Sequence, residues 1–155
     1  MKIGIGFDVH NFQSGRKLIL GGVEINHSKG LAGHSDADVL VHSIMDAMLG
    51  ACGLGDIGNH FPDSDSRYKN ISSLLLLEEV NKKMKKKCLS IVNIDCVLIL
   101  EKPRVSKYFQ DMKKKLSGIL KISEEAINIK ATTTEGLGFC GREEGIAAES
   151  AVLLE

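Results

Sequence analysis

The stretch Gly6-Phe7-Asp8-Val9-His10 contains two side chains that could bind a metal ion. Asp8 and His10 are two residues apart, so on a strand both leave the same face. A carboxylate beside an imidazole provides two ligands of a three-ligand zinc site, and we expect His42, on a following helix, to be the third. This set has no thiolate and leaves one coordination position open. It therefore favours a catalytic Zn²⁺, or another divalent transition metal, over a structural ion.

Other side chains are suited to phosphate. Hydroxyls and cations that could contact phosphate oxygens are present at Ser35, Thr132, Thr133, Thr134, Lys102, Arg104, Lys130 and Arg142. Glu135 could hold a second, harder cation such as Mg²⁺ between phosphates. No GxxxxGK[ST] sequence and no GxSxG serine occurs, so we expect neither a P-loop nucleotide enzyme nor a covalent intermediate on the protein.

Two glycine- or aspartate-rich loops have competing interpretations. Residues 53–58 match GxGxxG, but they follow a predicted helix and no helix is expected to open from them, which excludes a dinucleotide site. We expect instead a tight loop that presents Asp56. Residues 61–66 are either ordinary turns or a substrate lid.

The composition predicts one soluble globular domain. The chain has 155 residues, 43% hydrophobic and 26% charged, and its 20 basic and 20 acidic side chains cancel. Without a net field or basic–aromatic interleaving, we expect no nucleic-acid partner and no membrane partner. The four cysteines form no CxxC pair and the N-terminus lacks an apolar signal core, so we expect reduced thiols in a cytosolic protein.

Hydrophobic periodicity divides the chain into strands and helices. Strands are expected over residues 2–12, 16–20, 89–100, 127–132 and 145–154, and helices over 37–51, 71–87 and 105–120. On the first strand, Ile3, Ile5, Phe7 and Val9 share the face opposite Asp8 and His10.

The helix over 37–51 carries the third candidate ligand. We expect Ser35 or Asp36 to cap its N-terminus. Asp38, His42 and Asp46 are four residues apart and line one side. We hypothesise that Asp46 contacts His42, not the metal ion, and thereby orients this ligand.

Five separated motifs together resemble one enzyme family. They are Gly6-Phe7-Asp8-Val9-His10, Gly21-Gly22-Val23, His34-Ser35-Asp36-Ala37-Asp38, Gly55-Asp56-Ile57-Gly58 with Phe61-Pro62-Asp63, and Ala131-Thr132-Thr133-Thr134-Glu135 with Leu137-Gly138-Phe139. In this order they closely resemble the 2-C-methyl-D-erythritol 2,4-cyclodiphosphate synthase family of the non-mevalonate isoprenoid pathway. The resemblance covers essentially the whole chain.

The resemblance implies a lyase that needs no protein nucleophile. The substrate would be 4-diphosphocytidyl-2-C-methyl-D-erythritol 2-phosphate, whose own 2-phosphate attacks the β-phosphorus, closes the cyclic diphosphate and expels CMP. Positioning and electrostatics would then supply most of the catalysis. The alternatives are a zinc-dependent phosphodiesterase or phosphatase, which uses water, and a non-catalytic trimeric module with structural zinc.

The resemblance also implies roles for particular residues. Asp8, His10 and His42 would bind Zn²⁺, Glu135 would place Mg²⁺ or Mn²⁺, and His34 and Thr133 would stabilise the transition state. The implied substrate-binding residues are Asp8, His10, His34, Ser35, Asp56, Ile57, Gly58, Phe61, Pro62, Asp63, Ser64 and Asp65, then Leu100, Glu101, Lys102, Pro103, Arg104, Val105 and Ser106 with Thr132 near the cytidine, and Thr133, Thr134, Glu135, Phe139 and Arg142. Ser64, Arg104 and Gly136 depart mildly from the family pattern.

The implied fold is α+β: residues 1–155 form a single-domain, two-layer sandwich with a mixed β-sheet and helices on one face. Three chains would assemble as a homotrimer around their sheets, with active sites between subunits. Phe7, Phe139 and Arg142 resemble residues that line a central cavity able to hold an isoprenoid diphosphate; the alternative is that Phe7 and Phe139 are core residues. We expect a bacterial cytoplasmic location, or a plastid-type organelle if a transit peptide was removed.

Overall fold

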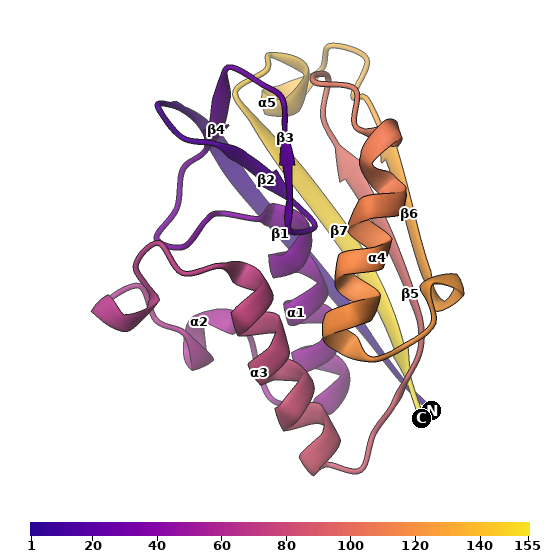
Figure 1. Ribbon diagram of the computed structural model, residues 1–155. Coiled ribbons are helices and arrows are strands. Elements are labelled where there is room, and N and C mark those ends of the chain that lie inside the picture. Colours follow the sequence, from indigo (N-terminus) through magenta and orange to yellow (C-terminus); the bar gives the residue numbers. More distant parts are fainter.

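One mixed sheet forms the back of the molecule. In the computed structural model, which describes residues 1–155, its five strands have the order β4-β1-β7-β5-β6 (Figure 1). The strands are β1 (Lys2–Ser14), β4 (Lys29–Leu31), β5 (Ile91–Ile99), β6 (Ile127–Thr132) and β7 (Gly145–Leu154). Neighbouring strands are antiparallel except β5 and β6, which are parallel. Two short strands, β2 (Leu18–Leu20) and β3 (Val23–Ile25), form a separate hairpin.

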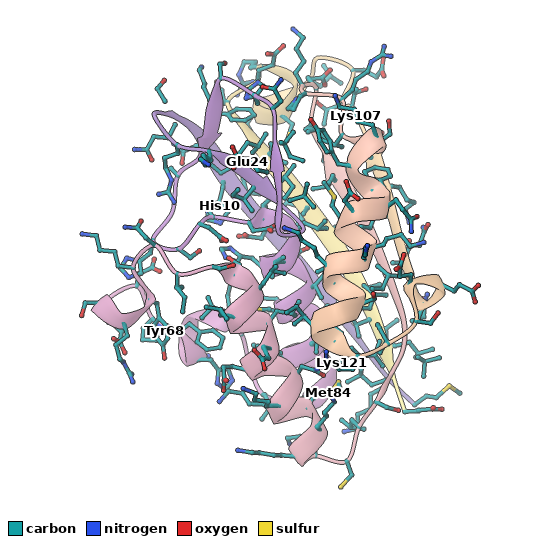
Figure 2. All side chains as sticks on the ribbon, viewed as in Figure 1. His10, Glu24, Tyr68, Met84, Lys107 and Lys121 are labelled. Carbon is teal, nitrogen blue, oxygen red and sulfur yellow. The ribbon has the colours of Figure 1, made fainter.

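Three helices, α1 (Val39–Cys52), α3 (Ser73–Lys86) and α4 (Phe109–Leu120), cover one face of the sheet (Figure 1). The core lies between these layers, where Met84 of α3, labelled in Figure 2, is buried. Met112 of α4 is buried in the same core. This arrangement confirms the α+β, two-layer fold expected from the resemblance. No helix combines the length and the apolar character that a bilayer crossing requires.

The shorter elements are α2 (Ile57–His60), α5 (Gly138–Gly141) and the 3₁₀ turns η1 (Ser66–Tyr68), η2 (Ser106–Tyr108) and η3 (Glu124–Ala126). Sequence periodicity missed most of them because one turn of helix has no repeating apolar stripe. The expectation that no helix opens from the glycine-rich segment 53–58 was wrong. Helix α2 begins at Ile57, and the Asp56 carboxylate caps it by accepting a hydrogen bond from the Asn59 amide.

On β1, the smallest residues face the core and large apolar side chains face outward, the reverse of the usual arrangement. The side toward α1 carries Gly4 and Gly6, which are buried, whereas Ile3 and Phe7 on the opposite side are 70% and 55% exposed. The glycines let the backbones of β1 and α1 approach closely: a Cβ on Gly6 would lie 2.0 Å from the Ser43 carbonyl oxygen. Further along the same face, Asp8 and His10 therefore lie beside α1.

The N-terminal cap of α1 is Asp38, so the predicted caps, Ser35 and Asp36, were wrong. Asp38 is fully buried and accepts hydrogen bonds from the amides of Gly21, Gly22 and Val41. Burial, together with the nearby charge of Asp36, raises the pKa of Asp38 to about 6 despite these bonds. The cap thus ties the start of α1 to the β2–β3 turn.

Candidate metal centre and substrate cavities

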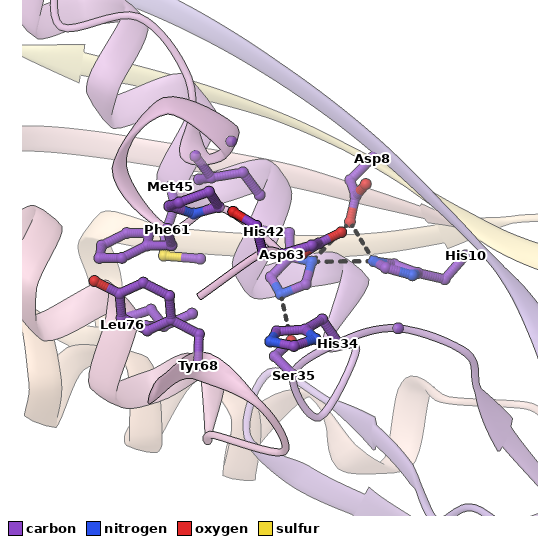
Figure 3. Close-up of a pocket in the computed structure, with 15 residues that line it drawn as sticks. Asp8, His10, His34, Ser35, His42, Met45, Phe61, Asp63, Tyr68 and Leu76 are labelled. Atoms are coloured by element: carbon purple, nitrogen blue, oxygen red, sulfur yellow. Dashed lines mark hydrogen bonds and ion pairs between the residues drawn. The ribbon is translucent and has the colours of Figure 1, made fainter. Parts of the chain in front are cut away.

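Three ligand atoms meet where β1 faces α1 (Figure 3). Asp8 Oδ2 lies 3.0 Å from His10 Nε2 and 3.0 Å from His42 Nδ1, and the two nitrogens are 3.1 Å apart. The predicted ligand set is therefore brought together by the fold, as an almost equilateral triangle. Its three side chains are only partly accessible, between 9% and 22% exposed.

This triangle fits a tetrahedral divalent ion. Zinc bonds of about 2.0–2.2 Å to nitrogen and oxygen place neighbouring tetrahedral ligands roughly 3.3 Å apart, close to the separations of 3.0 and 3.1 Å between these ligand atoms. Two imidazoles and one carboxylate also match the ligand chemistry of catalytic zinc.

The outer ring nitrogens of both histidines have partners, as metal-binding imidazoles require. His10 Nδ1 donates to the Ala32 carbonyl oxygen at 2.6 Å, because a carbonyl can only accept, so Nε2 keeps its lone pair. His42 Nε2 lies 2.9 Å from Ser73 Oγ and 3.2 Å from Ser35 Oγ.

The hypothesis that Asp46 orients His42 was wrong. Asp46 Oδ1 accepts a hydrogen bond from the Ile57 amide at 2.8 Å, whereas both ring nitrogens of His42 are engaged elsewhere. One helical turn places two residues on the same side of α1, but their side chains turn toward different neighbours. Asp46 holds the start of α2 against α1.

The pKa values of Asp8 and His10 are both shifted by their surroundings in the ligand triangle. Burial disfavours the charged form of Asp8, but hydrogen bonds and charge from His10 and His42 outweigh it and lower the pKa of the carboxyl. For His10, burial is likewise opposed by the hydrogen bond and charge of Asp8, and the net effect raises its pKa. The pocket therefore favours a carboxylate with a positive charge beside it, whether that charge is a proton or a metal ion.

The ligand triangle opens into a cavity of about 420 Å³. Its lining contains the predicted residues Asp8, His10, His34, Ser35, His42, Ile57, Gly58, Phe61, Pro62, Asp63 and Ser64. Sequence analysis missed Gly33, Met45, Tyr68 and Leu76, which also line it. Of these, only Met45 had a signal, since it lies three residues after His42 on the same helix.

Asp56 and Asp65 lie outside this lining. Asp56 caps α2, and the Asp65 carboxylate is paired with Arg67 at 2.6 Å. The Asp65 carbonyl oxygen is 3.2 Å from Nε2 of His34, which lines the cavity, so Asp65 contacts the site through its backbone.

Most of the segment that the resemblance assigned to cytidine lines a second, smaller cavity of about 220 Å³. It is lined by Leu100, Glu101, Pro103, Arg104, Val105, Ser106, Ala131, Thr132 and Thr133. Lys102 does not line it; its Nζ pairs with Glu143 at 2.9 Å. Thr133, expected to act together with His34, is thus in a different cavity of the chain from His34.

The loop after β6 is held by one carboxylate. Glu101 Oε1 accepts hydrogen bonds from the Thr134 amide at 2.9 Å, the Thr134 hydroxyl at 3.1 Å and the Gly136 amide at 3.3 Å. Thr133 Oγ1 donates to Glu135 at 2.8 Å. Glu101 is therefore a tether that links the smaller cavity to the loop bearing Glu135.

The residues assigned to a central cavity lie apart from both pockets. Phe7 and Phe139 are 55% and 39% exposed, and Arg142 is paired with Glu144 at 2.9 Å. Lys130 is likewise on the exposed strand surface, paired with Asp95.

The comparisons with known proteins agree with this fold. The family model described as the YgbB family matches residues 1–155, and the chain belongs to this family. It is 62% identical over 154 residues to the 2-C-methyl-D-erythritol 2,4-cyclodiphosphate synthase of Clostridium acetobutylicum, with 99% of each chain covered. The family recognised from the sequence motifs is thereby confirmed.

Two solved structures extend the likeness to three dimensions. A structure of 2C-methyl-D-erythritol-2,4-cyclodiphosphate synthase in a CDP-bound form has a TM-score of 0.91 and 32% identity, covering 99% of this chain and 100% of that one. The bifunctional IspDF of Campylobacter jejuni has a TM-score of 0.95 and 46% identity. This match covers 99% of the present chain, which spans only 42% of that longer protein.

Proposed function

We propose that this protein is a metal-dependent phosphorus–oxygen lyase. It cyclises 4-diphosphocytidyl-2-C-methyl-D-erythritol 2-phosphate to 2-C-methyl-D-erythritol 2,4-cyclodiphosphate and releases CMP. The observation that carries the proposal is the triangle of Asp8, His10 and His42 at the mouth of a cavity, in a chain whose named relatives are synthases of this product. In this proposal the substrate's own phosphate is the attacking group, so no residue of the cavity has to act as a nucleophile.

The residues of the chain would bind and orient the crowded phosphates. Asp8, His10 and His42 would hold Zn²⁺, and Glu135 would hold Mg²⁺ or Mn²⁺ against the diphosphate. When bound, such ions withdraw charge from phosphoryl oxygens. His34 lines the first cavity, where its ring could contact a phosphate oxygen, and Ile57 and Gly58 offer backbone contacts to the methylerythritol end. The second cavity would hold the cytidine; a related structure is a CDP-bound form.

We further propose a homotrimer with active sites between subunits. In one chain, His34 and Thr133 line different cavities, and a site shared between two chains would bring both residues to one substrate. The exposed side chains Ile3, Ile5 and Phe7 on β1 also form an apolar strip that a neighbouring sheet would bury. In this trimer, Phe7, Phe139 and Arg142 would hold an isoprenoid diphosphate. We also propose a bacterial cytoplasmic location. Light scattering of the purified protein tests the trimer.

Phosphorus NMR of the cytidine-diphosphate substrate, with the protein, Zn²⁺ and Mg²⁺, tests the reaction. We expect the cyclic diphosphate and CMP from the wild type and from the control His27→Ala, whose ring contacts Phe12 outside both cavities. His42→Ala should form neither. Free, uncyclised phosphates would identify a hydrolase instead. No turnover by folded, zinc-loaded protein would indicate a binding module.

A further inference from the structure

Behind His42, two further residues continue the hydrogen-bond chain away from the metal centre. His42 Nε2 lies 2.9 Å from Ser73 Oγ, and the Ser73 hydroxyl is hydrogen-bonded to Asp36 Oδ1. The other carboxylate oxygen, Asp36 Oδ2, accepts from the Ser73 amide at 3.0 Å. His42 is on α1, Ser73 is the first residue of α3, and Asp36 is in the loop before α1.

The donors and acceptors in this chain can be ordered in one way. An ionised carboxylate only accepts, so Ser73 must donate its hydroxyl proton to Asp36. The Ser73 oxygen then presents a lone pair to His42, whose Nε2 must carry the proton. Nδ1 of His42 is left with its lone pair, and this is the atom 3.0 Å from Asp8 Oδ2 and 3.1 Å from His10 Nε2.

We propose that Ser73 and Asp36 are positioning residues that hold His42 in the tautomer and ring orientation needed by a metal ligand. The inference rests on the metal centre of the proposed function. Second-layer partners of this kind typically change metal affinity by about 10–100-fold when they are removed.

Helix capping alone does not account for the contact. The Ser73 amide, one of the free N–H groups at the start of α3, is already bonded to Asp36 Oδ2, and Ser72, the N-cap residue, makes no side-chain bond. The Ser73 side chain is fully buried, and its oxygen also lies 3.4 Å from Ser35 Oγ. Ser35 is 3.2 Å from His42 Nε2 and is the one substitute acceptor beside that atom.

Zinc affinity of the full-length protein, measured by competition with a chromogenic chelator, tests the inference without an activity assay. We expect Ser73→Ala to weaken Zn²⁺ binding about tenfold, since Ser35 replaces part of the lost contact. Asp36→Asn should weaken it similarly. If the new side-chain nitrogen faces the Ser73 hydroxyl, it donates where the carboxylate accepted; if it faces the Ser73 backbone amide, that hydrogen bond is lost. The matched control Ser72→Ala should bind as the wild type does.

A double variant separates this role from a general structural one. If Asp36 acts through Ser73, then Asp36→Asn in the Ser73→Ala background should cost less than about a further twofold, instead of multiplying the two losses. Fully multiplicative losses, or a folded Ser73→Ala protein with wild-type affinity, would overturn the inference. If Ser73→Ala fails to fold, Asp36→Asn carries the test, and wild-type zinc affinity in that variant refutes the idea.

NMR of the zinc-loaded protein provides a second readout. The His42 Nε2 proton should give a downfield, slowly exchanging resonance in the wild type and in Ser72→Ala, and should move upfield in Ser73→Ala. An unchanged resonance contradicts the proposed hydrogen bond. A wild-type protein that binds no zinc would instead refute the metal centre itself, so the two failures are distinguishable.

Discussion

Gly6→Ala should force β1 and α1 apart and loosen the ligand triangle. The added Cβ would lie 2.0 Å from the Ser43 carbonyl oxygen and 2.7 Å from the Ala47 amide nitrogen, whereas ordinary contact begins near 3.4 Å. Both atoms are helix backbone and cannot rotate away. Helix α1, which carries His42, must therefore move relative to the strand that carries Asp8.

The cost follows from overpacking. Inserting one methyl group into a tightly packed interface costs about 1–3 kcal/mol. For a chain of this size, each kcal/mol corresponds to about 2–4 °C in Tm. Because the clash lies two residues from Asp8, we also expect weaker zinc binding.

Thermal unfolding of the metal-free protein and chelator competition for zinc measure these two effects. Gly50→Ala is the matched control, because Gly50 lies on the same helix and its Cβ would have no atom within 4 Å. It should be neutral or stabilising by up to about 1 kcal/mol, since alanine is the better helix former. A Gly6→Ala protein with wild-type Tm and wild-type zinc affinity would refute the close-packing argument.

Three further results are expected. Arg16 donates to the carbonyl oxygens of Gly33 and Ser35, on either side of His34, so it positions His34. Arg16→Gln should therefore lower kcat more than it raises KM, and the control Lys17→Ala should leave both unchanged. An unchanged kcat in Arg16→Gln would contradict this positioning role. The Thr134 and Gly136 bonds lower the pKa of Glu101, so its tether is complete above the ordinary pKa of 4.5 and is lost only as the pH falls through the lowered pKa of the folded protein. The Thr134 amide resonance should therefore shift on acidification in the wild type and stay constant in Glu101→Gln; equal shifts in both would count against the tether. Removal of metal by a chelator should abolish turnover and lower Tm, because a ligand at 100 times its Kd stabilises the folded state by about 2.7 kcal/mol; added Zn²⁺ should restore both, and full activity without metal would exclude the metal proposal.

The sequence by itself determined the local features. Two-residue spacing places Asp8 and His10 on one face of a strand, and this holds in any fold that contains the strand. Apolar periodicity likewise located the three long helices to within about four residues at each end, since amphipathic stripes are local signals. The motif order also identified the family, which the full-length matches confirm.

Tertiary structure decided which side chains face each other. Asp46, one turn from His42, was the sequence's best candidate partner, yet the imidazole bonds to Ser73, which is 31 residues away in the chain. Likewise, the apolar face of β1 is exposed and its glycine face is buried, because the close approach of α1 requires residues without side chains. Such contacts depend on how distant segments pack. Sequence spacing cannot supply them, because it describes only neighbours along one helix or strand.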